Sequence, residues 1–125
     1  MTPLLFLGIA VAGGVGAALR FFVDGLVRSR WPAGFPVGTA LINVSGSLVL
    51  GFVAGLLGHG ALPPGWELVL GTGLMGGYTT FSTASVESVR LIQARRYAAG
   101  ALNLFGVLVL AVAAGALGLW LGGFV

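Results

Sequence analysis

Hydroxyl side chains crowd one short stretch of an otherwise apolar segment. Residues 76–85 read GGYTTFSTAS, with five serine or threonine residues in ten positions. Glycine costs about 1 kcal/mol relative to alanine inside a helix, so the pair Gly76 and Gly77 favours an interruption here. Carbonyl oxygens freed by an interrupted membrane helix suit a hard cation such as Na⁺. The alternative stays open that the glycines only permit close helix contacts, with the hydroxyls bonded back to their own helix.

Two further polar positions stand out in apolar surroundings. Asn43 lies in a run without charge, and its amide can donate two hydrogen bonds and accept two, so it either joins helices or contacts a ligand. Arg20, Asp24 and Arg28 follow at four-residue spacing, which allows pairing along one helix face. That spacing fits either structural ion pairs or an electropositive vestibule that attracts anions.

Residue arrangements typical of enzymes are missing from the sequence. The chain has no cysteine and a single histidine, His59, which excludes thiol chemistry and a His-rich metal cluster. There is no phosphate loop of the Walker type. Glu67 opens an apolar run, where its charge favours a helix N-terminus. We therefore expect a protein that is not an enzyme.

Composition and hydropathy determine which elements must position these groups. Of 125 residues, 58% are hydrophobic and 7% charged, against roughly 25% charged in soluble domains. This excludes an ordinary soluble domain, a disordered chain and a nucleic-acid binder. Four continuous apolar runs each reach the ~20 residues that cross a bilayer, at about 3–27, 37–58, 66–89 and 98–123. We predict an all-α membrane protein, one domain of four transmembrane helices over 1–125, with the third helix broken near its middle.

The charges lie between the apolar runs and predict an orientation. The turn at 59–65, broken by Pro63 and Pro64, carries no Lys or Arg. The turns at 28–36 and 90–97 carry the five arginines Arg28, Arg30, Arg90, Arg95 and Arg96. The positive-inside rule then places these two turns in the cytoplasm and both termini outside.

Small residues recur every four positions in the first two runs. Gly8, Ala12 and Gly16 form one stripe, and Thr39, Asn43, Ser47, Gly51 and Gly55 form a longer one. Such stripes let membrane helices approach closely. Because four spans make a thin bundle, we expect an oligomer, most simply a dimer.

The chain resembles the Fluc/CrcB family of fluoride channels over its whole length. Three segments carry the resemblance: GGVGAALRF at 13–21, GTALINVSG at 38–46 and GGYTTFST at 76–83. The resemblance implies a bacterial inner-membrane channel that exports F⁻ passively and lowers cytoplasmic fluoride. It also implies an antiparallel dimer of four-span subunits with two pores at the subunit contact. A structural Na⁺ would lie at the dimer centre, at the break in the third helix.

Site residues are carried over by their matching positions. The resemblance implies a pore role for Asn43 and for the ring edge of Phe81. It also implies polar side chains along the pore, and we assign this role to Thr39, Ser82 and Thr83. Arg20 and Glu87 match vestibule residues, and Gly76 and Thr79 match the positions whose backbone carbonyls hold the Na⁺.

Three departures from the family pattern bear on the partner. The second of the family's two pore phenylalanines is replaced by Ala84, and a serine expected one turn after Asn103 is replaced by Val107. The arginine bias favours one fixed orientation, whereas a dual-topology homodimer needs balanced turns. We expect one half of a two-gene heterodimer, with a homodimer as the alternative. A small four-span proton-coupled drug exporter is the rival function, although such exporters depend on a glutamate in the first span.

Overall fold

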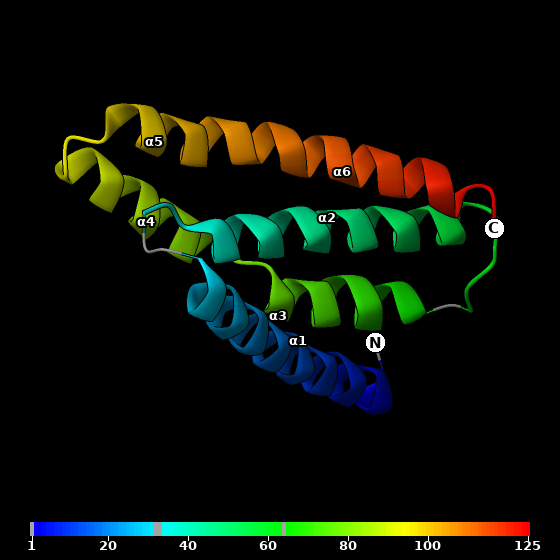
Figure 1. Ribbon diagram of the computed structural model, residues 1–125. Helices are drawn as coiled ribbons and strands as arrows, with labels where there is room; N and C mark the ends of the chain where they lie inside the picture. Colours follow the sequence, from blue (N-terminus) through cyan, green and yellow to red (C-terminus); the bar gives the residue numbers. More distant parts are fainter. Residues whose placement is uncertain (1, 32–33, 64) are drawn as a thin grey trace.

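The computed structural model describes residues 2–31, 34–63 and 65–125, so Pro64 of the predicted second turn lies outside the described residues. The elements are helical throughout and are drawn in Figure 1. In chain order they are α1 (Pro3–Arg30), α2 (Val37–Gly58), η1 (Leu68–Met75), α3 (Gly76–Tyr78), α4 (Phe81–Gln93), α5 (Tyr97–Ala101), η2 (Leu102–Gly106) and α6 (Val107–Gly122). The segments η1 and η2 are wound with π-helical turns.

Within the part of the chain that the structure describes, three helical stretches are long and apolar enough to cross a membrane: Pro3–Arg30, Val37–Gly58 and Tyr97–Gly122. The chain is therefore a multi-pass membrane protein. The remaining predicted run, 66–89, falls on η1, α3 and α4. Within it, α3 ends at Tyr78 and α4 begins at Phe81.

Two helices extend further than the predicted spans. The first reaches Arg30 instead of residue 27, and α4 reaches Gln93 instead of residue 89. Both extensions carry arginines in their last turn, where a positive charge is favoured by the helix dipole. The turns that follow are correspondingly shorter than the sequence predicted.

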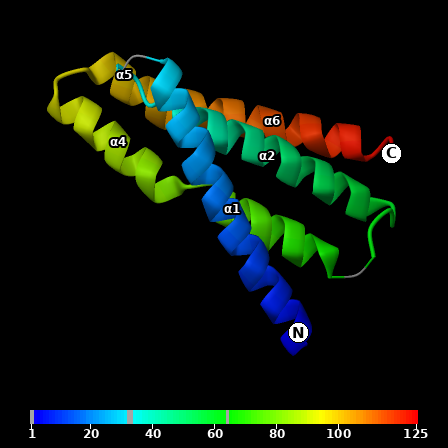
Figure 2. The same cartoon turned by 60° about the horizontal axis from the view of Figure 1, so that its bottom comes forward.

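The helices form layers that are held by close backbone contacts. In Figure 1, α6 lies along α2, α3 lies on the opposite side of α2, and α1 crosses below; Figure 2 shows the oblique crossing of α1. A Cβ added to Gly51 would overlap the Gly115 carbonyl of α6, and one added to Gly55 would lie 2.9 Å from Gly122 Cα. The glycines of the long predicted stripe therefore serve contacts within the chain.

Close backbone contacts at glycines also join α1 to η1 and α3. A Cβ on Gly77 would overlap the Gly13 carbonyl, and one on Gly16 would overlap that of Leu74. The α1–α2 and α4–α5 turns lie at one end of the molecule, and the α2–η1 turn and the C-terminus lie at the other (Figures 1 and 2). This places all five turn arginines at a single end.

Candidate functional site

The centre of the site is a short extended segment between α3 and α4. Thr79 has ψ 159° and Thr80 has φ −148° and ψ 119°, so neither continues a helix. Asn43, on α2, bonds both backbone groups of Thr80: its Nδ2 donates to the Thr80 carbonyl at 2.8 Å, and the Thr80 N–H donates to its Oδ1 at 2.8 Å. In a continuous helix that N–H would go to the Gly76 carbonyl. Asn43 therefore replaces the helical partners that the extended segment loses.

A second contact fixes the end of α3 against α2. The hydroxyls of Tyr78 and Ser45 are 3.0 Å apart, and Ser45 donates to the Ile42 carbonyl at 3.2 Å, so the Tyr78 hydroxyl is the donor between them. Gly46 makes room for this approach. A Cβ at Gly46 would lie 3.1 Å from the Tyr78 ring and would overlap the methyl group of Thr79.

The two threonines of the extended segment cap the helices on either side. The Thr79 hydroxyl donates back to the Met75 carbonyl at 2.8 Å. The Thr80 Oγ1 accepts from the Thr83 N–H at 3.2 Å and donates to the Thr83 hydroxyl at 3.1 Å, which makes Thr80 the N-cap of α4. Thr80 Oγ1 also lies 3.4 Å from Ser82 Oγ.

A groove with a volume of about 420 Å³ runs past this segment, between α2, α4 and the start of the last helix. Its polar lining residues come from all three: Asn43, Ser47, Thr79, Thr80, Ser85, Ser88 and Asn103. Phe81 also lines it, and this side chain is 83% exposed. The Asn43 amide and the ring edge of Phe81 can present positive charge to an anion. The hydroxyls of Thr79, Ser85 and Ser88 instead donate to carbonyls four residues earlier, as the alternative interpretation of the sequence allowed.

Asn103 supports the far wall of this groove. Its Nδ2 donates to the Ser88 hydroxyl at 2.8 Å and to the Ala84 carbonyl at 3.3 Å, and Ser88 itself donates to the Ala84 carbonyl at 2.9 Å. Asn103 is only 3% exposed. These bonds join η2 to α4 along one side of the groove.

Of the residues predicted for the pore, Asn43 and Phe81 line the groove, whereas Thr39 and Thr83 line an adjoining pocket with Arg20. This second pocket has a volume of about 280 Å³. Thr80 lines both and so separates them. Ser82 lies at the start of α4 and is exposed.

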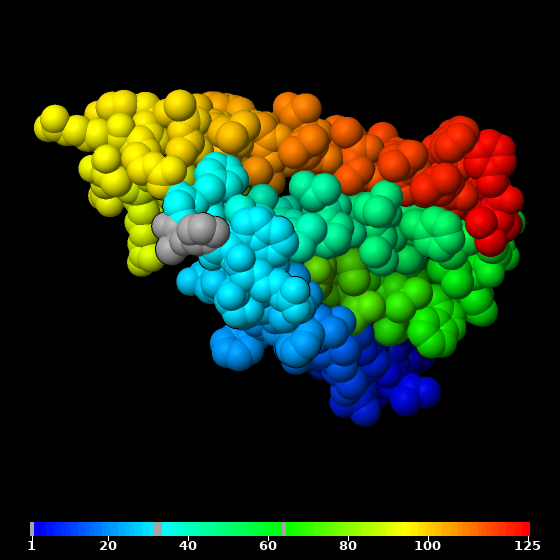
Figure 3. Space-filling model, viewed as in Figure 1, coloured from blue at the N-terminus to red at the C-terminus, as the bar shows by residue number. Residues whose placement is uncertain are grey.

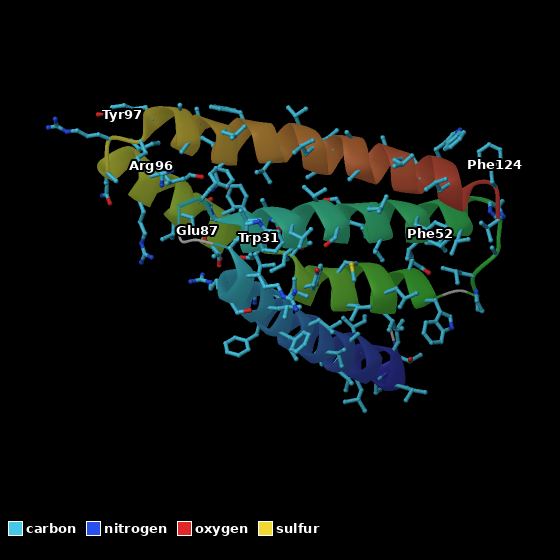
Figure 4. All side chains as sticks on the ribbon, in the orientation of Figure 1. Trp31, Phe52, Glu87, Arg96, Tyr97 and Phe124 are labelled. Atoms are coloured by element: carbon cyan, nitrogen blue, oxygen red, sulfur yellow. The ribbon has the colours of Figure 1, made fainter. Side chains whose placement is uncertain are left out.

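The three charged residues spaced along α1 do not act alike. Asp24 accepts from Arg28 Nε at 2.9 Å, whereas Arg20 lines the pocket with Thr39. Glu87 lines a third pocket, at the arginine-rich end, near Trp31 (Figure 4). Its Oε1 is buried without a hydrogen-bond partner among the described residues.

The predicted cation site, at Gly76 and Thr79, lies among uncharged groups of α3 and the extended segment. Among residues 2–31, 34–63 and 65–125 there is no cluster of His, Cys, Asp or Glu that could hold a metal. The oxygens at the end of α3 belong to backbone carbonyls, to threonine hydroxyls and to the Asn43 amide. The Thr80 N–H bonds to Asn43, so it does not serve the Gly76 carbonyl. Gly76 is exposed. A carbonyl donor of this kind fits Na⁺.

Sequence reasoning missed part of this site. Asn103 entered the sequence analysis only as a reference position for Val107, although the rarity of polar groups at membrane depth could have indicated a role for it. Ser47 was seen only as part of a stripe. Nothing in the sequence pattern indicated Ser88, whose hydroxyl matters because it meets Asn103 from another helix.

Comparison with known proteins gives matches over nearly the whole chain. The family model described as CrcB-like protein, Camphor Resistance (CrcB), matches residues 7–119. The protein named fluoride-specific ion channel FluC 1 of Leifsonia xyli subsp. xyli is 60% identical over 124 residues, which cover 98% of this chain and 90% of that protein. The proteins named FluC 2 of Mycobacterium tuberculosis and Cutibacterium acnes are 41% and 43% identical, over 97% and 95% of this chain and 93% and 98% of their own lengths.

Proposed function

Since this chain belongs to the CrcB-like family, we propose that it is a subunit of a fluoride-specific ion channel that exports F⁻ passively and lowers cytoplasmic fluoride. The observation that carries this function is the near-complete match to proteins named fluoride-specific ion channels. The polar groove in a multi-pass membrane protein supports it. A passive channel performs no covalent chemistry and is not an enzyme.

The ion path follows the groove and the adjoining pocket. Fluoride is small and strongly hydrated, so it needs hydrogen-bond donors in place of water. The groove offers the amide of Asn43 and the positive ring edge of Phe81. The hydroxyls of Thr39, Ser82 and Thr83 continue the path. Arg20 and Glu87 form the vestibule, in which the guanidinium attracts the anion.

A second four-span subunit, inserted antiparallel, completes the channel. The support for it is physical: a groove lined by hydroxyl and amide groups is unfavourable against lipid, because the hydrocarbon offers no hydrogen bonds. Phe81, at 83% exposure beside that groove, reaches outward to the space that a partner would occupy. In this arrangement η1, α3 and α4 form one membrane span, interrupted at Thr79 and Thr80.

The carbonyls of Gly76 and Thr79 would hold a structural Na⁺ where the two subunits meet. When bound, the ion supplies a fixed positive charge at the subunit contact. The support for this site is that the Thr80 N–H is committed to Asn43. The Gly76 carbonyl therefore lacks the donor that a continuous helix would give it.

Pairing with a different subunit is favoured over a homodimer. Ala84 and Val107 both line the groove. The phenylalanine and the serine of the family pattern are therefore missing at positions that border the proposed pore. The five turn arginines at one end favour a single orientation in the inner membrane, with both termini outside. A paired homologue would then insert the opposite way. Fluoride efflux from liposomes that contain only this chain would instead support the homodimer.

No observation favours a proton-coupled drug exporter, because α1 has no glutamate and the relatives are named as fluoride channels. Expression in a bacterial strain that lacks its own fluoride exporter tests the proposed function. The chain, alone or with its paired homologue, should restore growth at fluoride concentrations that stop the empty-vector strain, and Asn43→Ala should not. If neither the chain alone nor the chain with its paired homologue restores growth, although the protein is present in the membrane, the proposal is overturned.

A further inference from the structure

The end of the molecule that carries the α1–α2 and α4–α5 turns holds a pocket built by arginines from separate elements. Arg28 comes from the last turn of α1, Arg90 from the last turn of α4, and Arg96 from the turn after α4. The pocket has a volume of about 280 Å³. Figure 4 shows Arg96 and Trp31 at this end, and Figure 3 shows how far the α4–α5 turn projects beyond the rest of the molecule.

Two of these arginines are held in place while retaining donors. Arg28 uses Nε to bond Asp24 at 2.9 Å, which occupies one of its five N–H donors. Arg96 donates through Nη1 to the Gly34 carbonyl, which joins the turn after α4 to the α1–α2 turn. A guanidinium fixed by one bond still presents N–H groups to an oxyanion.

Apart from its charged residues, this pocket has a largely apolar lining. It includes Val27, Trp31, Phe35 and Leu91. Trp31 is 55% exposed, at the end of a helix long enough to span the bilayer, where tryptophan is enriched at the membrane surface. A pocket that combines guanidinium groups with apolar walls at this depth matches a ligand with a phosphate beside a hydrocarbon chain.

The charge balance of the pocket favours an anion. Asp24 and Glu87 also line it, but Asp24 is already bonded to Arg28, and the three arginines outnumber the two carboxylates. Arg30 and Arg95 lie at the same end and add to its positive potential. The α2–η1 turn at the opposite end carries no Lys or Arg.

We propose that this pocket binds the headgroup phosphate of an anionic phospholipid of the phosphatidylglycerol class. Basic pockets between membrane helices recognise such headgroups, and arginine suits phosphate because its planar donors can bind two oxygens at once. The apolar walls favour a lipid over free phosphate, which has no hydrocarbon to place against Trp31 and Leu91. This pocket shares no lining residue with the groove. It does share Asp24 with the adjoining pocket, and Glu87 of the proposed vestibule also lines it.

Native mass spectrometry of the purified, full-length protein tests this directly. The protein is exchanged into detergent with equal phosphatidylglycerol and phosphatidylcholine, and the retained lipid is counted. We expect preferential retention of phosphatidylglycerol, reduced about fivefold by Arg90→Gln and again by Arg96→Gln, which corresponds to the ~1 kcal/mol of one arginine near an anionic lipid. Arg30→Gln and Arg95→Gln remove the same charge at the same end but lie outside the pocket, and should retain the lipid.

Three results would overturn the proposal. The first is equal retention by wild type and the pocket variants. The second is an equal loss in the control variants, which would show attraction by total charge instead of a pocket. The third is displacement of the lipid by millimolar inorganic phosphate, which would make free phosphate the ligand. An unchanged elution profile for each variant excludes misfolding as the cause.

Discussion

The side-chain amide of Asn43 and the backbone of Thr80 form a reciprocal pair of hydrogen bonds, each 2.8 Å between nitrogen and oxygen. One residue from α2 thus satisfies both main-chain groups of a residue that belongs to no helix. These bonds show the joining role considered for Asn43 from the sequence, while its contact with a ligand stays a prediction. Its remaining N–H and lone pair are available to the groove.

Asn43→Ala should therefore reduce both stability and ion flux. It leaves the Thr80 N–H and carbonyl without partners, which costs about 1–3 kcal/mol. Asn43→Asp keeps the acceptor for the Thr80 N–H and loses the donor to the Thr80 carbonyl. Its stability should therefore lie between that of the wild-type protein and that of Asn43→Ala. Thermal unfolding in detergent measures the effect, with Ser29→Ala as a control because that exposed hydroxyl bonds only the nearby Leu26 carbonyl. An alanine variant as stable as wild type would contradict the role assigned to this pair.

Gly46→Ala should displace the extended segment. The added methyl group would overlap Thr79 and press on the Tyr78 ring, and overpacking of this kind costs about 1–3 kcal/mol. Gly58→Ala is the matched control on the same helix, since nothing lies within 4 Å of a Cβ there. We expect lower stability and lower fluoride efflux for Gly46→Ala and neither change for Gly58→Ala. Equal behaviour of the two variants would show that close approach at Gly46 is unimportant.

Asn103 and Ser88 should be energetically coupled across the groove wall. Their 2.8 Å hydrogen bond is buried and joins η2 to α4. A double-mutant cycle with Asn103→Leu and Ser88→Ala should give a coupling energy of about 1 kcal/mol in unfolding experiments. If the losses of unfolding free energy in the two single variants add up to that of the double variant within ~0.3 kcal/mol, the bond does not couple η2 to α4.

Sodium should stabilise the assembled protein if backbone carbonyls at the end of α3 hold it. A ligand that binds only the native state at a hundredfold excess over its Kd stabilises by ~2.7 kcal/mol. The unfolding temperature should rise with Na⁺ at constant ionic strength, with K⁺ as the replacement ion. Identical unfolding curves in the two salts would remove Na⁺ from the account.

The sequence predicted the coarse architecture because apolar length and charge position are local properties. The run at 37–58 matches α2, and the arginine-bearing turns lie at one end as expected. The helix ends were less accurate, because Arg28 and Arg30 could equally have belonged to a turn. The glycine pair at 76–77 indicated a weak helix, but the extended residues are Thr79 and Thr80, and Asn43 is what satisfies them.

The candidate site was only partly predictable because it depends on contacts between distant segments. Ser88 and Asn103 meet only through the pairing of α4 with η2. The spacing of Arg20, Asp24 and Arg28 allowed Asp24 to pair in either direction; it pairs with Arg28. Arg20 lines a pocket with Asp24, Thr39 and Thr83. A four-residue spacing on both sides of a carboxylate allows an ion pair with either arginine, so spacing alone does not predict which pair forms.

Fluoride efflux from liposomes tests the central claim most directly. Vesicles loaded with fluoride and containing this chain, alone and together with the proposed partner subunit, are monitored with a fluoride electrode. A parallel set is loaded with chloride and its Cl⁻ efflux is measured. The account predicts rapid F⁻ efflux in at least one preparation, without a proton gradient and without matching Cl⁻ efflux, and its loss in Asn43→Ala. No F⁻ efflux from either preparation, or efflux that requires a proton gradient, would contradict it.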